Sequence, residues 1–232
     1  MAGRALTSEV AYIVGNGRSR DGFDLEQLIG SGTIWGCNAL YRDWANEGSN
    51  RRFMLPDYLV SIDHGIISEI ENSEFPSERF IVPDHDEQYE PAEVNPGRPR
   101  SNAGMNAMIE AIRKGANILI CLGFDFLLPG NVTNMYDGTE NYTMETRATA
   151  QDNKGRCRYL QWFVEQNPDV TFFFVYPKFD KDIHDDSVLD CTVERRHRQP
   201  AFPATSRDIV VPIAGERVHY CTYEQLLANL EE

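Results

Sequence analysis

Short apolar runs alternate with helical patterns along this chain, and that alternation limits the possible folds more than any other feature of the sequence. Asn117–Leu122 is an apolar run of the kind expected for a strand that is buried on both faces. A helical pattern from Thr149 to Gln166 comes later, and it leads to Val170–Val175, the most strand-like segment of the chain. Strands separated by helices are typical of a parallel sheet. We therefore predict an α/β fold with a mostly parallel sheet that is flanked by helices.

The other regular elements are placed by periodicity and by turn residues. Further strands are predicted at Val10–Val14, Thr33–Cys37, Tyr58–Ile62 and Arg79–Val82. Short helices are predicted at Asp24–Leu28, Ala39–Trp44 and Gly65–Ile70. We expect Ser101 to cap a longer helix that ends at Gly115, because serine is a common N-cap and glycine commonly follows the last turn.

Residues 179–232 differ in pattern from the rest of the chain. We predict a Rossmann-like domain over residues 1–178 and a C-terminal extension, residues 179–232, packed on the same domain. Within the extension, Ile209–Ile213 and Arg217–Tyr220 are expected to form a small β-hairpin. Thr222–Gln225 has the pattern of a capping box and is expected to open a final helix.

Composition excludes several classes of protein. The net charge of −14 makes nucleic acid an unlikely partner, because proteins that bind duplexes carry a basic face for the phosphates. No stretch is apolar and long enough to cross a membrane, so no membrane partner is expected. The five cysteines are scattered without a CxxC pair, which favours free thiols in a reducing, cytoplasmic compartment. The sequence leaves the oligomeric state open, a homo-oligomer included.

Polar or glycine residues follow four of the predicted strands. The loop Gly15–Ser19 follows the first strand, and its glycines would let backbone amides approach a phosphate. Asn38 follows the second strand and would suit the edge of a base or ribose, or would cap a helix. Asp63 and His64 follow the third, and Asp125 follows the fifth. Because open α/β sheets bind ligands beyond the carboxyl ends of their strands, these residues predict one site there.

These motifs, taken in order, resemble a known enzyme family. GNGRS at Gly15–Ser19, CNALY at Cys37–Tyr41, the Ser101 region and GFDF at Gly123–Phe126 are similar to motifs of the bacterial sialyltransferases of glycosyltransferase family 42. Pro56–Asp63 more closely resembles the related DUF115 clan, which includes flagellin-modifying glycosyltransferase-like proteins and archaeal hydroxymethylpterin diphosphokinases. The opening segment also resembles bacteriophage proteins without an assigned function. The resemblance implies a single Rossmann-like domain, a variant of the GT-A type.

The resemblance also implies roles for individual residues. Asn16 and Asn38 stand at positions that contact a cytidine nucleotide sugar in the family, and Arg98 and Ser101 stand where the donor is bound. With Gly15, Gly17, Ser19 and Asp125 they complete the predicted nucleotide site. Tyr136 could hold the donor phosphate, as a family tyrosine does.

The family's catalytic histidine has no counterpart here. The chain has no histidine between His85 and His184, where the family places that residue. We therefore expect a base from another strand end, Asp63 or His64, which completes the predicted catalytic set with Tyr136.

Three functions remain in view. The first is a glycosyltransferase that uses a nucleotide sugar, with CMP-sugar as a donor and a carbohydrate or small-molecule acceptor. The second is a Mg²⁺-dependent diphosphokinase of the hydroxymethylpterin type, with carboxylates from Asp63, Asp125 and either Asp84 or Asp86. The third is a nucleotide-binding member of the fold without catalytic activity. No metal ligands are assigned, because a charged run such as the one with Asp84 and Asp86 is more often a solvated loop than a Mg²⁺ site. Mg²⁺ is the one cofactor that the sequence raises.

Overall fold

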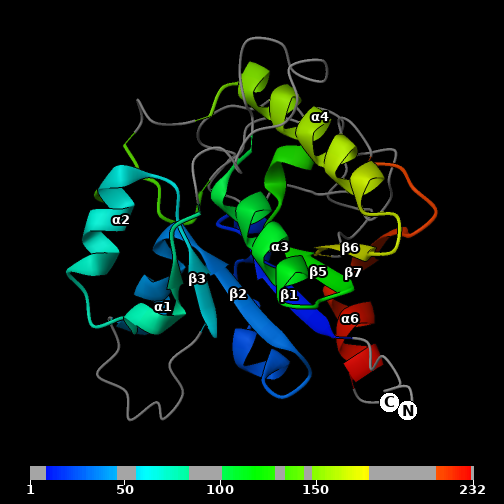
Figure 1. The fold of residues 1–232 in the computed structure, drawn as a ribbon, viewed down its shortest axis with the longest axis horizontal. Helices are drawn as coiled ribbons and strands as arrows, with labels where there is room; N and C mark the ends of the chain where they lie inside the picture. The colour runs from blue at the N-terminus through cyan, green and yellow to red at the C-terminus, as the bar shows by residue number, and fades with distance from the viewer. Residues whose placement is uncertain are drawn as a thin grey trace, which may run out of the picture.

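The computed structural model describes residues 9–45, 56–83, 101–128, 134–143, 148–177 and 213–230. Its seven strands form a single sheet in the order β4-β3-β2-β1-β5-β6-β7 (Figure 1). Every strand pair is parallel. This arrangement confirms the predicted α/β, Rossmann-like fold with helices flanking a parallel sheet.

The strands lie close to their predicted positions. Their bounds are β1 Val10–Val14, β2 Thr33–Cys37, β3 Tyr58–Val60, β4 Phe80–Ile81, β5 Ile118–Leu122, β6 Thr171–Tyr176 and β7 Val218–Thr222. The α-helices are α1 Arg42–Ala45, α2 His64–Glu71, α3 Ala103–Arg113, α4 Ala150–Gln166 and α6 Tyr223–Leu230. Short 3₁₀ turns are η1 Arg18–Arg20, η2 Leu25–Leu28, η3 Asn38–Tyr41, η4 Ser77–Arg79 and η6 Asp125–Leu127.

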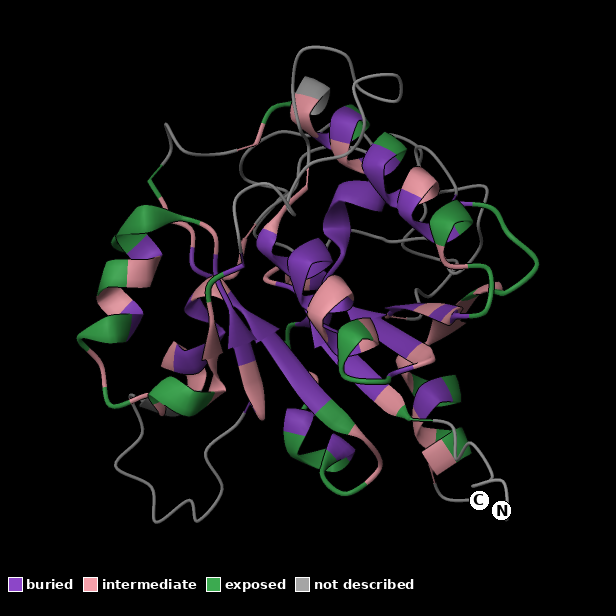
Figure 2. Ribbon diagram, in the orientation of Figure 1, coloured by how far each residue is buried: buried purple, intermediate pink, exposed green. Residues whose placement is uncertain are grey.

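Each face of the sheet carries its own apolar core. Along β1, Ala11 and Ile13 belong to one core while Tyr12 and Val14 belong to the other, as the two-residue period of a strand requires. Helices α3 and α4 contribute to the first core, and α2 and α6 contribute to the second. The central strands are therefore buried on both sides, as Figure 2 shows. This burial explains why β5 is apolar along its whole length.

The starts of two long helices show one wrong prediction and one correct one. Asn102, not Ser101, caps α3, because its side chain accepts a hydrogen bond of 2.9 Å from the amide of Met105. Ser101 lies one residue too early for that bond, since α3 begins at Ala103. Thr149 caps α4 with a capping box that involves Asp152, at the predicted start of that helix.

The described part of the C-terminal extension contains a strand and a helix. Strand β7 pairs in parallel with β6, from Phe172↔Val218 to Tyr176↔Thr222, and so extends the same sheet. Thr222 and Gln225 exchange hydrogen bonds of 2.9 and 3.2 Å, which confirms the predicted capping box before α6. Residues 209–212 of the expected hairpin lie outside the described residues.

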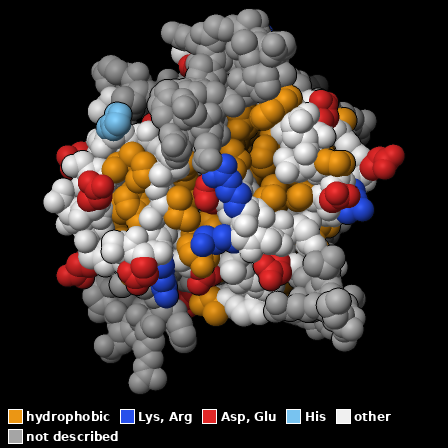
Figure 3. All heavy atoms as spheres, viewed as in Figure 1, with side chains coloured by type: hydrophobic (Ala, Val, Ile, Leu, Met, Phe, Trp, Pro, Cys, Tyr) orange, Lys and Arg blue, Asp and Glu red, His pale blue; other side chains and the backbone are white. Residues whose placement is uncertain are grey.

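None of the described helices has the length and apolar character needed to span a membrane. On the face of the molecule in Figure 3, acidic side chains are scattered widely. Some Lys and Arg side chains of the described residues form a small group near the centre of this view, and others stand apart from it at the lower left and at the right edge.

Candidate functional site

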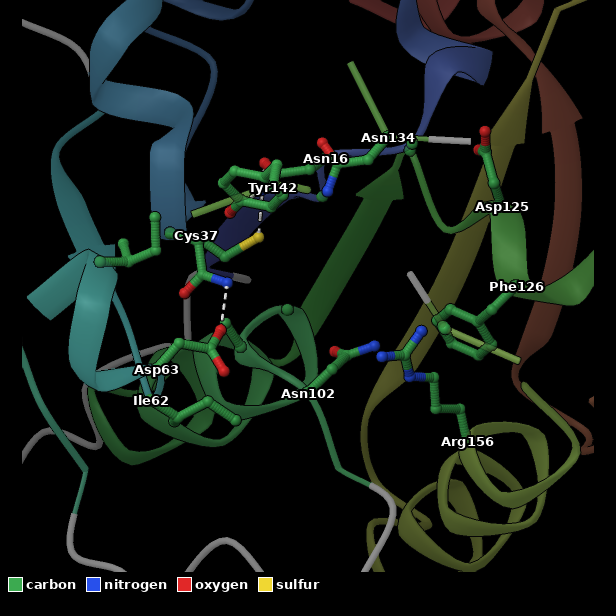
Figure 4. A pocket seen from close by; sticks show the side chains of 18 of the residues that line it. Asn16, Cys37, Ile62, Asp63, Asn102, Asp125, Phe126, Asn134, Tyr142 and Arg156 are labelled. Carbon is green, nitrogen blue, oxygen red and sulfur yellow. Dashed lines mark hydrogen bonds between the residues drawn. The ribbon is translucent and has the colours of Figure 1, made fainter. Parts of the chain in front are cut away.

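A cavity of about 400 Å³ lies at the carboxyl ends of β1, β2, β3 and β5. The strand order reverses between β1 and β5, and ligands of open α/β sheets bind at such a point. Residues that follow each of these four strands line the cavity (Figure 4). Further side chains that line it come from the start of α3, the segment 134–142 and α4: Asn102, Asn134, Asp137, Asn141, Tyr142 and Arg156.

The structure brings most of the predicted nucleotide-binding residues together. Those lining the cavity are Gly15, Asn16, Gly17, Asn38, Ser101 and Asp125, together with Asp63 from the predicted catalytic set. Ser19 is buried beside the cavity. Arg98 lies outside the described residues, so its predicted role stays a prediction.

The loop Gly15–Ser19 packs directly against the end of β5. The amide of Gly15 donates to the carbonyl of Leu122 at 2.8 Å, and the amide of Gly17 donates to the carbonyl of Gly123 at 3.1 Å. These two amides therefore already have hydrogen-bond partners within the protein. The glycines allow the backbones at the ends of β1 and β5 to lie in close contact. A Cβ atom at Gly15 would lie 2.7 Å from the carbonyl oxygen of Gly123.

The carboxylate of Asp125 binds the end of that loop, at Ser19. It accepts a hydrogen bond of 3.0 Å from the amide of Ser19 and a second bond from the Ser19 hydroxyl. Burial raises the pKa of Asp125 to about 6. The anion that the loop accommodates here is thus a carboxylate of the protein, and a ligand phosphate would need other donors.

Asn16 is held in a defined orientation. Its Nδ2 donates to the hydroxyl of Tyr142 at 3.2 Å. Its Oδ1 lies 3.8 Å from the thiol of Cys37, which has a closer acceptor in the carbonyl of Val14 at 3.4 Å. Burial raises the pKa of Cys37 to about 12, so this thiol keeps its proton and remains a donor. Both contacts are consistent with an Asn16 amide whose Nδ2 donates and whose Oδ1 accepts.

Asn38 is oriented in a similar way from the next strand. The buried Ser61 hydroxyl donates to Asn38 Oδ1 at 2.9 Å, and Asn38 Nδ2 donates to Asp63 Oδ2 at 2.8 Å. The backbone of Asn38 has φ of 49°, a left-handed conformation that asparagine tolerates better than most residues. Such conformations cluster at functional sites.

The other two predicted catalytic residues lie outside the cavity lining. His64 is exposed at the first position of α2. Tyr136 is buried, and its hydroxyl donates to Asp43 at 2.7 Å and accepts from Arg20 at 3.0 Å. Arg20 also donates through Nε to the carbonyl of Gly15 at 2.8 Å. Tyr136 therefore ties segment 134–142 to the loop after β1.

Reasoning from the sequence missed several residues of the cavity, Tyr142 and Arg156 among them. Tyr142 lies six residues after Tyr136 in the same segment, so the pattern alone gave no means of choosing between them. Burial raises the pKa of Tyr142, which keeps its hydroxyl protonated. Arg156 projects from α4 toward the cavity (Figure 4).

Among the residues that the structure describes, no group of three or more His, Cys, Asp or Glu side chains could hold a metal ion. Asp84 and Asp86 of the predicted diphosphokinase set lie outside the described ranges. Asp63 and Asp125, the other carboxylates of that set, both line the cavity.

Comparison of the chain with protein-family models, with curated proteins and with solved structures finds no significant match. A functional proposal therefore depends on the cavity and on the motifs that surround it.

Proposed function

We propose that this chain is a nucleotide-sugar-dependent glycosyltransferase of the sialyltransferase-like kind, with a CMP-sugar as donor and a carbohydrate or small molecule as acceptor. One observation carries the proposal. Asn16, Asn38 and Ser101, at the motif positions that imply donor binding, come from three separate segments and line one cavity. Their gathering at the sheet edge is the arrangement that a nucleotide site requires.

The chemistry of the lining supports a nucleotide with a phosphate. The amides of Asn16 and Asn38 have further hydrogen-bonding capacity for a base or a ribose, since each uses only part of its donors and acceptors in the bonds described above. Arg156 supplies positive charge for a phosphate group. The protonated hydroxyl of Tyr142 would donate to a leaving phosphate and stabilise its charge.

Ligand binding tests the first part of the proposal. Saturation-transfer NMR would compare CMP, CMP-sugar, UDP-sugar and ATP, the last with and without Mg²⁺. We expect CMP and CMP-sugar to bind, and we expect at least tenfold weaker binding by Asn16→Ala. Asn229→Ala is the matched control, because Asn229 is exposed on α6, away from the cavity lining. Binding of ATP with Mg²⁺ but of no nucleotide sugar would reject the proposal and favour the diphosphokinase.

Turnover separates the enzyme from a binding protein of the same fold. Release of CMP from a CMP-sugar, followed by chromatography with a panel of sugar acceptors, is expected to exceed the rate without protein. A chain that binds CMP-sugar and releases no CMP with any acceptor would instead be the non-catalytic member of the fold.

A further inference from the structure

Asp63 stands at a helix start without acting as the helix cap. Its backbone is extended at the N-cap position of α2, yet its side chain makes no capping hydrogen bond. An aspartate at this position ordinarily accepts a hydrogen bond from an amide of the first turn, and that bond stabilises the helix. The Asp63 carboxylate instead lines the cavity.

Two polar side chains hold the Asp63 carboxylate in that direction. Asn38 Nδ2 donates to Asp63 Oδ2 at 2.8 Å, and Asn38 is itself held by the hydroxyl of Ser61. Ser61 is fully buried and is fixed through its amide, which donates to the carbonyl of Ile81 at 3.1 Å. The second oxygen, Oδ1, makes no hydrogen bond with the described residues. The hydrogen bonds from Ser61 to Asn38 and from Asn38 to Asp63 therefore leave Oδ1, and the remaining acceptor capacity of Oδ2, available to the cavity.

Charge decides what such a carboxylate can accept. In the described part of the chain no Lys or Arg forms an ion pair with Asp63, so the group repels a phosphate. A pair of neighbouring hydroxyls is neutral and offers two donors, which suits a carboxylate that can accept through both oxygens. Figure 4 shows Asp63 and Arg156 on opposite sides of Asn102, so these two charged groups face the cavity from different directions.

We infer that Asp63 accepts hydrogen bonds from the ribose hydroxyls of the nucleotide and makes the site selective for ribonucleotides over 2′-deoxyribonucleotides. The inference rests on the proposed function, because it assumes a nucleotide in the cavity. Asp63 then determines which nucleotides bind, whereas the sequence predicted that it acts as a base. Acidic side chains at strand ends of other nucleotide-binding α/β sheets hold the ribose 2′-hydroxyl in this way.

Calorimetric titration with matched nucleotides tests the inference. The probes are CMP and 2′-deoxy-CMP, with ATP and 2′-deoxy-ATP as a second pair. For the pair that binds, we expect the intact protein to prefer the ribonucleotide at least tenfold. Asp63→Ala is expected to bind both members of the pair about equally, and no more tightly than the intact protein binds the deoxynucleotide.

Two further variants distinguish a lost contact with the ribose from a loss of folding. Ser61→Ala leaves the carboxylate in place but releases Asn38, so it is expected to reduce the preference partly. Asp169→Ala removes an exposed carboxylate between α4 and β6 and is expected to keep the full preference. Equal binding of both nucleotides by the intact protein, or a preference that survives in Asp63→Ala, overturns the inference and leaves the proposed function standing. Absence of binding to all four nucleotides overturns both.

Discussion

At the scale of single residues, Gly17 is required by space and not by backbone conformation. Its φ of −69° is open to any residue. A Cβ atom at this position would overlap the carboxyl group of Asp125 and would lie 2.5 Å from the carbonyl oxygen of Gly123. The loop after β1 and the loop after β5 can approach this closely only because no side chain stands between them.

Gly17→Ala is therefore expected to destabilise the protein by about 2 kcal/mol, within the range for overpacked sites. Gly22→Ala is the matched control, because Gly22 has φ of 80° with nothing within 4 Å of an added Cβ. That variant should cost only about 1 kcal/mol of backbone strain. Urea denaturation measures both values, and a Gly17→Ala cost no larger than that of Gly22→Ala would contradict the described packing.

Asp125 gives the fold a predictable response to pH. Burial raises its pKa from 3.8 to about 6, so the folded chain binds this proton more tightly than the unfolded chain does. The contribution of Asp125 to stability is therefore fully present below about pH 4 and falls as the pH rises to about 6. Each pKa unit corresponds to about 1.4 kcal/mol, so the change is roughly 3 kcal/mol at most.

Asp125→Asn removes this titration. The difference in unfolding free energy between the intact protein and Asp125→Asn, measured by urea denaturation at several pH values, should decrease between pH 4 and pH 6. A difference that grows over the same interval would show that the carboxylate is stabilised in its charged form.

At the scale of elements, segment 134–142 is fastened to the start of the sheet by buried polar contacts. Met135 donates its amide to the carbonyl of Asn16 at 2.8 Å, and Arg20 forms a 3.2 Å ion pair with Asp43 beside the Tyr136 hydroxyl. This fastening places Tyr142 beside Asn16. The segment is thus a wall of the cavity, and Tyr136 is a positioning residue.

Tyr136→Phe is expected to lower the free energy of unfolding by about 1 to 2 kcal/mol, because Arg20 and Asp43 each lose a buried partner. The rate of CMP release at saturating donor should change less than twofold. Thermal unfolding and initial-rate kinetics check the two values. A large loss of rate in a fully stable variant would instead make Tyr136 a catalytic residue, as the sequence had suggested.

Helix α4 contributes one cation to the cavity. Arg156→Ala is expected to weaken binding of CMP about tenfold and to leave binding of cytidine unchanged, because charge-assisted bonds to a phosphate would be lost. Arg158→Ala is the control, since Arg158 is exposed on the same helix and does not line the cavity. Titration calorimetry distinguishes the outcomes: equal weakening of CMP and cytidine would place Arg156 away from the phosphate.

The elements themselves were largely predictable from the sequence, since apolar period and turn residues determine them locally. The strand segments, the start of α4 and the capping box before α6 are found where the pattern placed them. The cap of α3 was not, because Ser101 and Asn102 are adjacent and both are good N-cap residues. The two choices differ by one residue in where α3 begins, and local sequence patterns do not distinguish them.

At the scale of the whole molecule, the rim of the parallel sheet was predictable but its internal contacts were not. Parallel strands bring their carboxyl ends to one edge, so Asn16, Asn38 and Asp63 had to lie near one another. The pairing of Asn16 with Tyr142, 126 residues away, depends on how loops pack on that edge. The same is true of Asp125, whose carboxylate accepts a hydrogen bond from the glycine loop where the sequence predicted a phosphate.

The central claim, that a nucleotide binds at this edge of the sheet, is tested most directly by NMR of ¹⁵N-labelled protein titrated with CMP. The account predicts that the largest shifts fall on the backbone amides of residues 15–19 and 37–39 and on the side-chain amides of Asn16 and Asn38. The amide signals of residues in α6 should not shift. Shifts confined to α6, or none with any nucleotide or nucleotide sugar, would contradict it.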